Sequence, residues 1–459
     1  MKKLQRTSHL GILLLLSLFL NVVLALAPLS ADSEQEGTQR YQYILQTLLH
    51  YMDAYFVEEV ATDKLMEGAV RGLLAAGQDP YTRFLNADEM KQFMGMEGGS
   101  RIGIGVELVL EAGEPLILAP MPGGPAMRAG IRPRDIIEAV DGTETRGLDI
   151  GRLSQLVTGE RGTPVRLRIR REGFDESLEI EVIRGEFQMD YVRTHWFAKE
   201  QLGYIQLTHF FGEESGSVRD FEKALQSFSN RRARGLILDL RDNTGGHLDM
   251  AAHLAGLFVK KGAAIVEARG RFQEWNRTLY ATEENAGRYQ NLPMVVLINN
   301  SSASASEIMA GALQDHARAR LLGEQSFGKA SVQRIFRDLP GNAGALITIQ
   351  KYYTPKGRQI HGKGLKPDIL VPSWQASRAE SFYHYQMNKA GVFAAFKKQH
   401  PNYQSGLPAV FQADMQKRGW PISAEFALRL MKQHYHESSG ELDPQTDTQL
   451  QRALAELSR

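Results

Sequence analysis

One stretch constrains the fold of this chain more than any other, because in it an apolar run breaks into small polar residues and a helix follows. Met294–Ile298 is apolar throughout, as expected of a strand that is buried on both faces. The serine-rich segment after it leads into small and apolar residues that predict a helix. A serine at such a junction exposes its hydroxyl, and N–H groups at the helix start point to where a negative oxygen could form. The pattern predicts an α/β fold with a reactive serine at this turn.

A lysine downstream has the surroundings of a general base. Lys329 directly follows Phe327 and Gly328, a bulky ring and a flexible residue. A lysine in apolar surroundings loses affinity for its proton, and a general base needs that change. Free lysine titrates near 10.4, so burial has to lower the pKa by about three units for activity near neutrality.

The motifs around these residues resemble a known family. Ser-Ala-Ser-Ala-Ser-Glu-Ile at 302–308, Gly-Glu at 323–324, Phe-Gly-Lys at 327–329 and Val-Gln at 332–333 are similar to the carboxyl-terminal processing proteases, the tail-specific serine peptidases. The resemblance implies that Ser304 is the nucleophile, Lys329 the base and Gln333 the partner that orients the base. A glutamine can hold the lysine without adding a negative charge that would raise its pKa. Ala330 departs from the family, which commonly has glycine there.

Two neighbouring serines are alternatives to Ser304 as the nucleophile. Ser302 and Ser306 lie in the same motif, and Ser306 is placed to cap the helix before Glu307.

A glycine pair after a second buried strand is the candidate oxyanion hole. Leu-Arg-Asp-Asn-Thr-Gly-Gly at 240–246 resembles the family's Leu-Arg-Asn-Asn-Pro-Gly-Gly, with Asp242 and Thr244 departing from it. Paired glycines let backbone N–H groups face a cavity without obstruction by side chains. We expect the N–H of Gly245 or Gly246, together with that of Ala305, to stabilise the oxyanion. The alternative is an ordinary strand-to-helix turn.

Residues 98–186 have a different texture, with short alternating strands between glycine turns. Gly-Pro-Ala at 124–126, Ala-Gly-Ile at 129–131 and Gly-Thr-Pro-Val at 162–165 resemble a PDZ domain. Such a module binds an extended peptide at an open sheet edge and receives its terminal carboxylate on backbone N–H groups. We expect an apolar C-terminus to be bound by the loop and groove strand and by two leucines of a helix over Arg152–Thr158: Ile102, Gly103, Ile104, Gly105, Val106, Leu153 and Leu156.

Composition excludes several other functions. The 459 residues include 54 basic and 53 acidic side chains, so no general basic field favours nucleic acid. The chain has no cysteine, which rules out disulfides and thiolate chemistry. His253, His316 and His361 are available for a Ser/His/Asp triad, but no Gly-x-Ser-x-Gly elbow accompanies them. No His-Glu-x-x-His motif occurs, and we expect neither a metal nor another cofactor.

The N-terminus has the pattern of an export signal. Lys2, Lys3 and Arg6 precede an apolar run from Leu10 to Ala27 and small residues. We expect residues 1–27 to be a signal peptide, with a retained membrane anchor as the alternative. The location expected is the bacterial periplasm or cell envelope, either free or associated with the membrane.

These observations together predict an α/β (α+β) multidomain protein. The segments are a signal at 1–27, an N-terminal helical segment at 28–97, a PDZ domain at 98–186, a peptidase core at 187–372 and a C-terminal helical extension at 373–459. The resemblance implies that the core shares the crotonase and Clp-type peptidase fold.

The function predicted is an exported serine endopeptidase that recognises C-terminal tails and works through an acyl-enzyme. The alternative is a catalytically silent PDZ scaffold of the cell envelope, and a third possibility is a resting enzyme that opens when ligand binds. Expected partners are proteins or peptides with apolar C-termini, a second copy of the chain and an adaptor protein.

Overall fold

The computed structural model describes residues 33–458, except 96–99, 112, 122, 149, 173, 175, 189–190, 212–215, 437–441 and 443. The predicted signal at 1–27 therefore lies outside the described residues. The chain divides into two compact units, residues 1–73 and 74–459. The first contains α2 (Ser33–Tyr55) and most of α3 (Thr62–Ala75). Within the described ranges no helix is long and apolar enough to cross a membrane.

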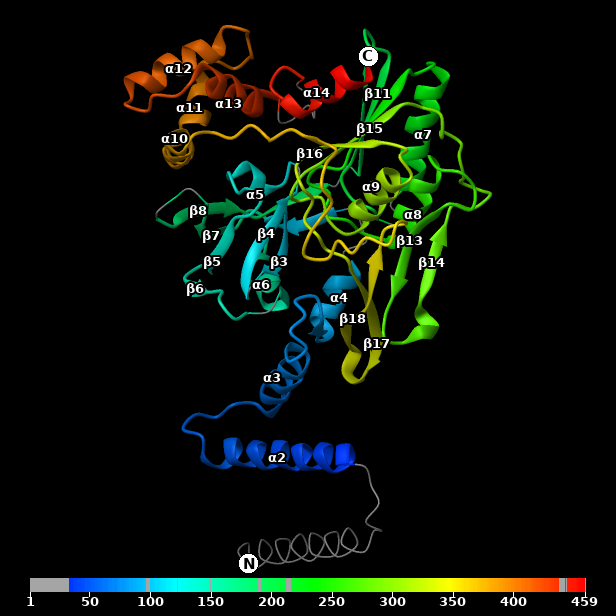
Figure 1. Ribbon diagram of the computed structural model, residues 1–459. Helices are drawn as coiled ribbons and strands as arrows, with labels where there is room; N and C mark the ends of the chain where they lie inside the picture. The colour runs from blue at the N-terminus through cyan, green and yellow to red at the C-terminus, as the bar shows by residue number, and fades with distance from the viewer. Residues whose placement is uncertain are drawn as a thin grey trace, which may run out of the picture. The chain divides into compact units, whose positions relative to one another are not determined.

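The second unit is built on a six-stranded sheet (Figure 1). Its strands, in spatial order, are β10 (Val192–Phe197), β11 (Leu202–Leu207), β12 (Gly235–Asp239), β15 (Met294–Ile298), β16 (Arg320–Gly323) and β19 (Ile369–Leu370). All neighbours are parallel except β10 and β11. Every residue of β12 and β15 is buried, which explains their continuous apolar sequences.

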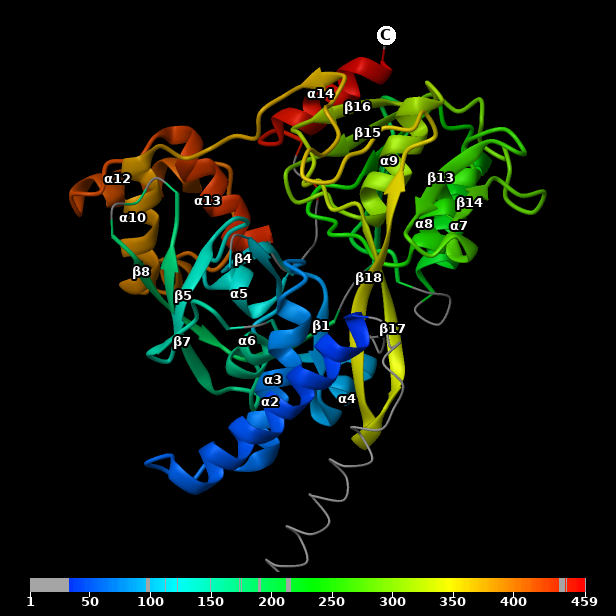
Figure 2. The same cartoon turned by 60° about the horizontal axis from the view of Figure 1, so that its bottom comes forward.

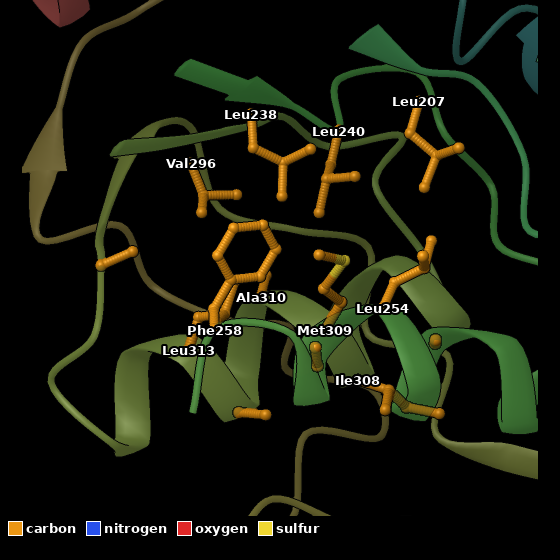
Figure 3. Packing of buried hydrophobic residues seen from close by; sticks show 14 of the residues in the cluster. Leu207, Leu238, Leu240, Leu254, Phe258, Val296, Ile308, Met309, Ala310 and Leu313 are labelled. Atoms are coloured by element: carbon orange, nitrogen blue, oxygen red, sulfur yellow. The ribbon is translucent and has the colours of Figure 1, made fainter. Parts of the chain in front are cut away.

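Helices cover both faces of this sheet. Leu238 and Val296 pack against α8 (Leu248–Gly256) and α9 (Ala305–Asp315), and Figure 3 shows these strand side chains facing Met309 and Leu313. The alternate strand residues pack on the other face against α14 (Thr448–Leu457). The amphipathic α7 (Ser217–Asn230) completes the first layer through Phe221 and Phe228.

A second sheet carries a long hairpin, drawn in yellow in Figure 2. Its strands are β1 (Arg83–Leu85), β18 (Ala343–Tyr353), β13 (Ala264–Arg269) and β14 (Arg277–Tyr280), with β17 (Ser331–Leu339) paired to β18. Short 3-10 turns lie at Gln273–Trp275 and Pro340–Asn342. Strand β1 precedes α4 (Ala87–Gly95), so part of the segment predicted to be only helical is a strand of the core.

The predicted PDZ segment forms a separate antiparallel sheet. Its strands are β3 (Val106–Glu111), β4 (Glu114–Pro120), β5 (Ile136–Val140), β7 (Pro164–Arg170) and β8 (Leu178–Ile183), with β6 (Thr143–Glu144) on β5. Helices α5 (Pro125–Arg128) and α6 (Ile150–Val157) pack on it, and β2 (Ser100–Gly103) pairs with β9 (Gly185–Gln188). Strand β3 begins at Val106, because the chain turns at Gly105 with φ 71°.

The C-terminal extension is helical, as predicted, and has a core of its own. It contains α10 (Arg378–Lys389), α11 (Val392–Gln399), α12 (Leu407–Lys417) and α13 (Ala424–His436). Phe411, Met415 and Leu430 are buried among these helices. The mixed α/β fold class is thus confirmed.

Candidate active site

Ser304 lies at the sharp turn between β15 and α9, where it is the residue before the first helical one. Its backbone has φ 55° and ψ −115°, a combination that non-glycine residues rarely adopt. The conformation is that of a serine held on a strained strand-to-helix turn. Such strain persists only where the surrounding structure holds it, and it concentrates at functional sites.

The two alternative serines are engaged elsewhere. The hydroxyl of Ser302 donates to the Leu240 carbonyl at 2.8 Å, and that of Ser306 to the Asn243 carbonyl at 2.7 Å. Both side chains are fully buried. The expectation that Ser306 caps the helix is wrong, because α9 begins at Ala305 and Ser306 lies within its first turn.

Glu307 organises the turn, although the motifs of the sequence do not assign it a functional role. Its carboxylate accepts the backbone N–H groups of Ser304, Gly328 and Lys329 and the hydroxyl of Ser326, at 2.6–2.9 Å. Burial raises the pKa of Glu307 to about 7, against the lowering effect of these donors. Nucleophile and base segments thus share one acceptor. The Ser-x-x-Glu spacing of a capping box, from Ser304 to Glu307, was the signal available in the sequence.

Lys329 has the environment of a base that can lose its proton. Desolvation lowers the pKa of its amine, while the charges of Glu107, Asp79 and Glu307 oppose that change and Arg83 adds to it. The ammonium nitrogen lies 4.5 Å from the centre of the Tyr81 ring, a cation–π distance. Among the described residues no hydrogen bond joins Lys329 Nζ to Ser304 Oγ.

Tyr352 and Gln333 hold the strands next to the dyad. The Tyr352 hydroxyl donates to the carbonyl oxygens of Ser304, at 2.9 Å, and of Lys329. Gln333 donates through Nε2 to Ser331 Oγ at 2.9 Å and to the hydroxyl of Thr348 at 3.0 Å. The side chain of Gln333 thus lies in the β17–β18 hairpin without a hydrogen bond to Lys329, and its orienting role stays a prediction.

The glycine pair lies against the turn of Ser304. A Cβ on Gly245 would lie 2.7 Å from Ser304 Cβ and 2.9 Å from the Ala305 nitrogen, so only glycine allows this approach. The Gly245 N–H donates to the Asn243 side chain at 2.9 Å. The N–H groups of Gly246 and Ala305 have no acceptor among the described residues, so the choice of donors stays a prediction.

The residues before this loop are tied to distant parts of the chain. Arg241 pairs with Asp239 at 2.5 Å and with Asp447, at the start of α14, at 2.7 Å. Burial alone would raise the pKa of Asp447, but Arg241 outweighs burial and lowers it. Asp242 accepts a hydrogen bond from the Asn299 side chain at 2.8 Å. Ion pairs and hydrogen bonds therefore hold the glycine loop, and one of these ion pairs comes from the C-terminal helix α14.

The predicted peptide-binding residues gather at the open edge of the PDZ sheet. Strand β3 ends the sheet and has α6 beside it. The N–H groups of Ile104 and Gly105 have no acceptor among the described residues, and Gly103 and Gly105 both have positive φ.

The predicted side chains differ in exposure. Ile104 and Leu153 are buried, Val106 and Leu156 are partly buried against the PDZ core, and Ile102 is exposed on β2. Backbone and partly buried side chains thus offer more to a peptide here than Ile104 or Leu153.

In the part of the chain that the structure describes, no group of three or more His, Asp or Glu side chains is placed to hold a metal ion.

Comparison with known proteins assigns the family. Residues 201–371 match the model of peptidase family S41, residues 116–171 a PDZ domain, and residues 28–89 the N-terminal domain of the activating protease CtpB. The carboxy-terminal-processing protease of Bartonella bacilliformis is 36% identical over 312 residues, 67% of this chain and 70% of that protein. The processing protease CtpA of Bacillus subtilis is 30% identical over 74% of this chain and 71% of its own length.

A solved structure of a processing protease has the same fold. The photosystem II D1 C-terminal processing protease superposes with a TM-score of 0.61 at 26% identity, over 74% of this chain and 94% of that one. Fold and site together define a serine-type peptidase that carries a PDZ domain. The chain belongs to peptidase family S41, the carboxy-terminal processing proteases.

Proposed function

We propose that this chain is an exported endopeptidase that cleaves proteins near their C-termini, with Ser304 as nucleophile and Lys329 as general base. The observation that carries the proposal is the strained backbone of Ser304 beside the glycine loop. Of the three serines in the motif, Ser304 alone combines this conformation with a hydroxyl that is not given to a buried carbonyl.

The chemistry proposed is acyl transfer. Neutral Lys329 takes the hydroxyl proton as Ser304 Oγ attacks the scissile carbonyl, and backbone N–H groups hold the oxyanion. The ammonium returns its proton to the leaving amine, and water then hydrolyses the acyl-enzyme. The two side chains do not share a hydrogen bond in this structure, so the proposal includes a small rearrangement that brings them together when substrate binds.

Recognition is assigned to the PDZ domain. The peptide pairs with the open edge of β3, and the N–H groups of Ile104 and Gly105 receive its carboxylate. Residues 1–27 support export to the periplasm or cell envelope. Exposed apolar side chains along α2, including Tyr43, Leu48 and Tyr55, support association with a second copy or an adaptor.

The test is cleavage of an unstructured protein with an apolar C-terminus by the chain without residues 1–32. Ser304→Ala and Lys329→Ala should both bind the tail but leave the protein uncut, whereas Ser302→Ala should still cut it. Because the neutral amine is required, wild-type activity should rise with pH through the pKa of Lys329. Normal cleavage by either dyad variant would refute the assignment, and binding without cleavage by the wild type would favour a scaffold.

A further inference from the structure

Strand β3 has one face toward the PDZ interior and the other toward the catalytic loops. Val106 and Leu108 pack against the PDZ core. Val109 packs in a cluster with Ala303, next to the nucleophile, and Phe327, two residues before the base. Glu107, two residues before Val109, also faces the catalytic loops, because its carboxylate accepts a hydrogen bond from Thr244. The strand whose open edge is available for a peptide therefore also contacts the active site.

Glu107 reaches the glycine loop from the PDZ domain. Its carboxylate accepts a hydrogen bond from the Thr244 hydroxyl, and His209 Nε2 lies 3.6 Å from it. Burial alone would raise the pKa of Glu107, but His209, Thr244 and Lys329 outweigh burial and lower it. The pairing of β3 with β4 shifts register between Glu107 and Leu108. Such bulges re-aim side chains next to active sites.

Two further observations set this contact apart from ordinary packing. His209 is buried, yet neither of its ring nitrogens makes a hydrogen bond with a described residue. Buried polar groups usually have hydrogen-bond partners, and the nearest charged group to His209 Nε2 is the Glu107 carboxylate at 3.6 Å. Thr244 also stands where the family motif has proline, which has no hydroxyl to donate. The hydrogen bond to Glu107 therefore depends on a residue in which this chain departs from the family motif.

We propose that Glu107 is a positioning residue that the PDZ domain supplies to the active site: it holds Thr244 of the glycine loop until a peptide pairs with β3. The inference rests on the proposed function of Ser304 and Lys329.

The negative charge of Glu107 affects the protonation of Lys329. A negative charge near an ammonium group stabilises the charged form, so Glu107 works against the neutral amine that catalysis needs. Asp79 and Glu307 act in the same direction, Arg83 acts against them, and the Tyr81 ring lies over the amine. Of these groups, only Glu107 is carried by the strand that offers its edge to the peptide. A peptide strand added at that edge would shift β3, and with it the Glu107 carboxylate relative to the glycine loop.

The test compares Glu107→Gln with Glu111→Gln, which removes a charge from the same face of the same strand. Both are assayed for kcat/KM between pH 5 and 10 on an unstructured protein, with and without an apolar-tailed peptide in trans. Without peptide, Glu107→Gln should raise kcat/KM at pH 7 by about threefold to tenfold. The acid limb of its pH profile, the low-pH side on which activity falls, should move to lower pH. Stimulation by peptide should be reduced. Glu111→Gln should behave as wild type.

Two more variants separate charge from hydrogen bond. Thr244→Val removes the donor and keeps the charge, so stimulation should fall while the acid limb stays in place. Glu107→Asp keeps the charge and should retain the wild-type acid limb.

The proposal would be overturned if Glu107→Gln kept both the wild-type acid limb of the pH profile and the wild-type stimulation by peptide. It would also be overturned if the variant lost activity without any shift of that limb. If Ser304→Ala or Lys329→Ala cleaves normally, the proposed function itself falls. If both are inactive while Glu107→Gln matches the wild type, only this inference falls.

Discussion

At the scale of single residues, the site depends on side chains whose hydrogen bonds hold the nucleophile and base segments together. Glu307 and Tyr352 have this role, and neither carries out the proposed chemistry. Both bind the main chain at Ser304 and Lys329, one through N–H groups and the other through carbonyls. The distance between the two reacting side chains is therefore set largely by residues outside the dyad.

Glu307→Gln should lower stability and turnover together. One amide oxygen cannot accept the four hydrogen bonds of the carboxylate, and the new NH2 group faces donors. We expect a loss of about 2 to 4 kcal/mol in the free energy of unfolding and a larger effect on kcat than on KM. Denaturant titration and steady-state kinetics measure both. The exposed Glu283→Gln is the control, and wild-type values for Glu307→Gln would contradict this role.

Tyr352→Phe should leave the fold intact while loosening the dyad. The substitution removes one hydroxyl and leaves the carbonyls of Ser304 and Lys329 without that donor. The loss should cost about 1 to 3 kcal/mol in stability and reduce kcat several-fold. Tyr353→Phe, on the neighbouring and less buried residue, is the matched control. An unchanged kcat would show that the two carbonyls are held by other contacts.

At the scale of elements, the C-terminal helix supports the glycine loop through one ion pair. Asp447 caps α14 by accepting the Leu450 N–H at 2.9 Å, and it also binds Arg241. Asn caps helices as well as Asp does, so Asp447→Asn removes the charge and keeps the cap. We expect kcat to fall several-fold while the helix stays folded by circular dichroism. Full activity would show that Asp239 and the side chain of Gln449 suffice to hold Arg241.

The elements that sequence predicted well are those whose patterns are local. The apolar runs of β12 and β15 and the amphipathic α7 follow from their own residues. Strand β17 was not predicted, because its pairing with β18 depends on a hairpin and its side chains are mostly exposed or partly buried.

The residues of the candidate site also fall into those that local motifs predict and those that tertiary contacts place. Serine, lysine and glycine pair follow from motif spacing, whereas Tyr81, Glu107 and Tyr352 reach the site from three separate segments. Their roles depend on tertiary contacts that no spacing encodes.

At the scale of the whole second unit, the C-terminal extension connects the PDZ domain to the core. Helix α14 packs on the central sheet. Helix α10 contacts the PDZ domain, where Arg132 lies 3.4 Å from Ser381 Oγ and 3.3 Å from His384 Nδ1, and Tyr385 donates to the Glu179 carbonyl. The C-terminal extension therefore contacts both the core sheet and the PDZ domain that carries β3.

The contact between α10 and the PDZ domain, made through His384 and Arg132, should weaken in acid. Burial, with the charges of Arg132, His434 and Arg171, lowers the pKa of His384 to about 3. A histidine whose pKa is depressed on folding stabilises the fold above its unfolded pKa, near 6.5, and loses that contribution as pH falls toward the folded value. Acidification from pH 7 to pH 5 should therefore cost about 2 kcal/mol through His384 alone.

His384→Gln tests this dependence, because the amide oxygen still accepts from Arg132 but gains no proton. Hydrogen exchange of α10–α13 at pH 5 and pH 7 should show strong acid loosening in the wild type and a weaker response in the variant. His195→Gln, an exposed histidine of the core strand β10, should respond as the wild type does. Equal pH dependence in the wild type and His384→Gln would mean that other groups control the acid response. Loosening of α10 would remove its contacts with the PDZ domain. Stimulation of activity by peptide should therefore also weaken below pH 6 in the wild type.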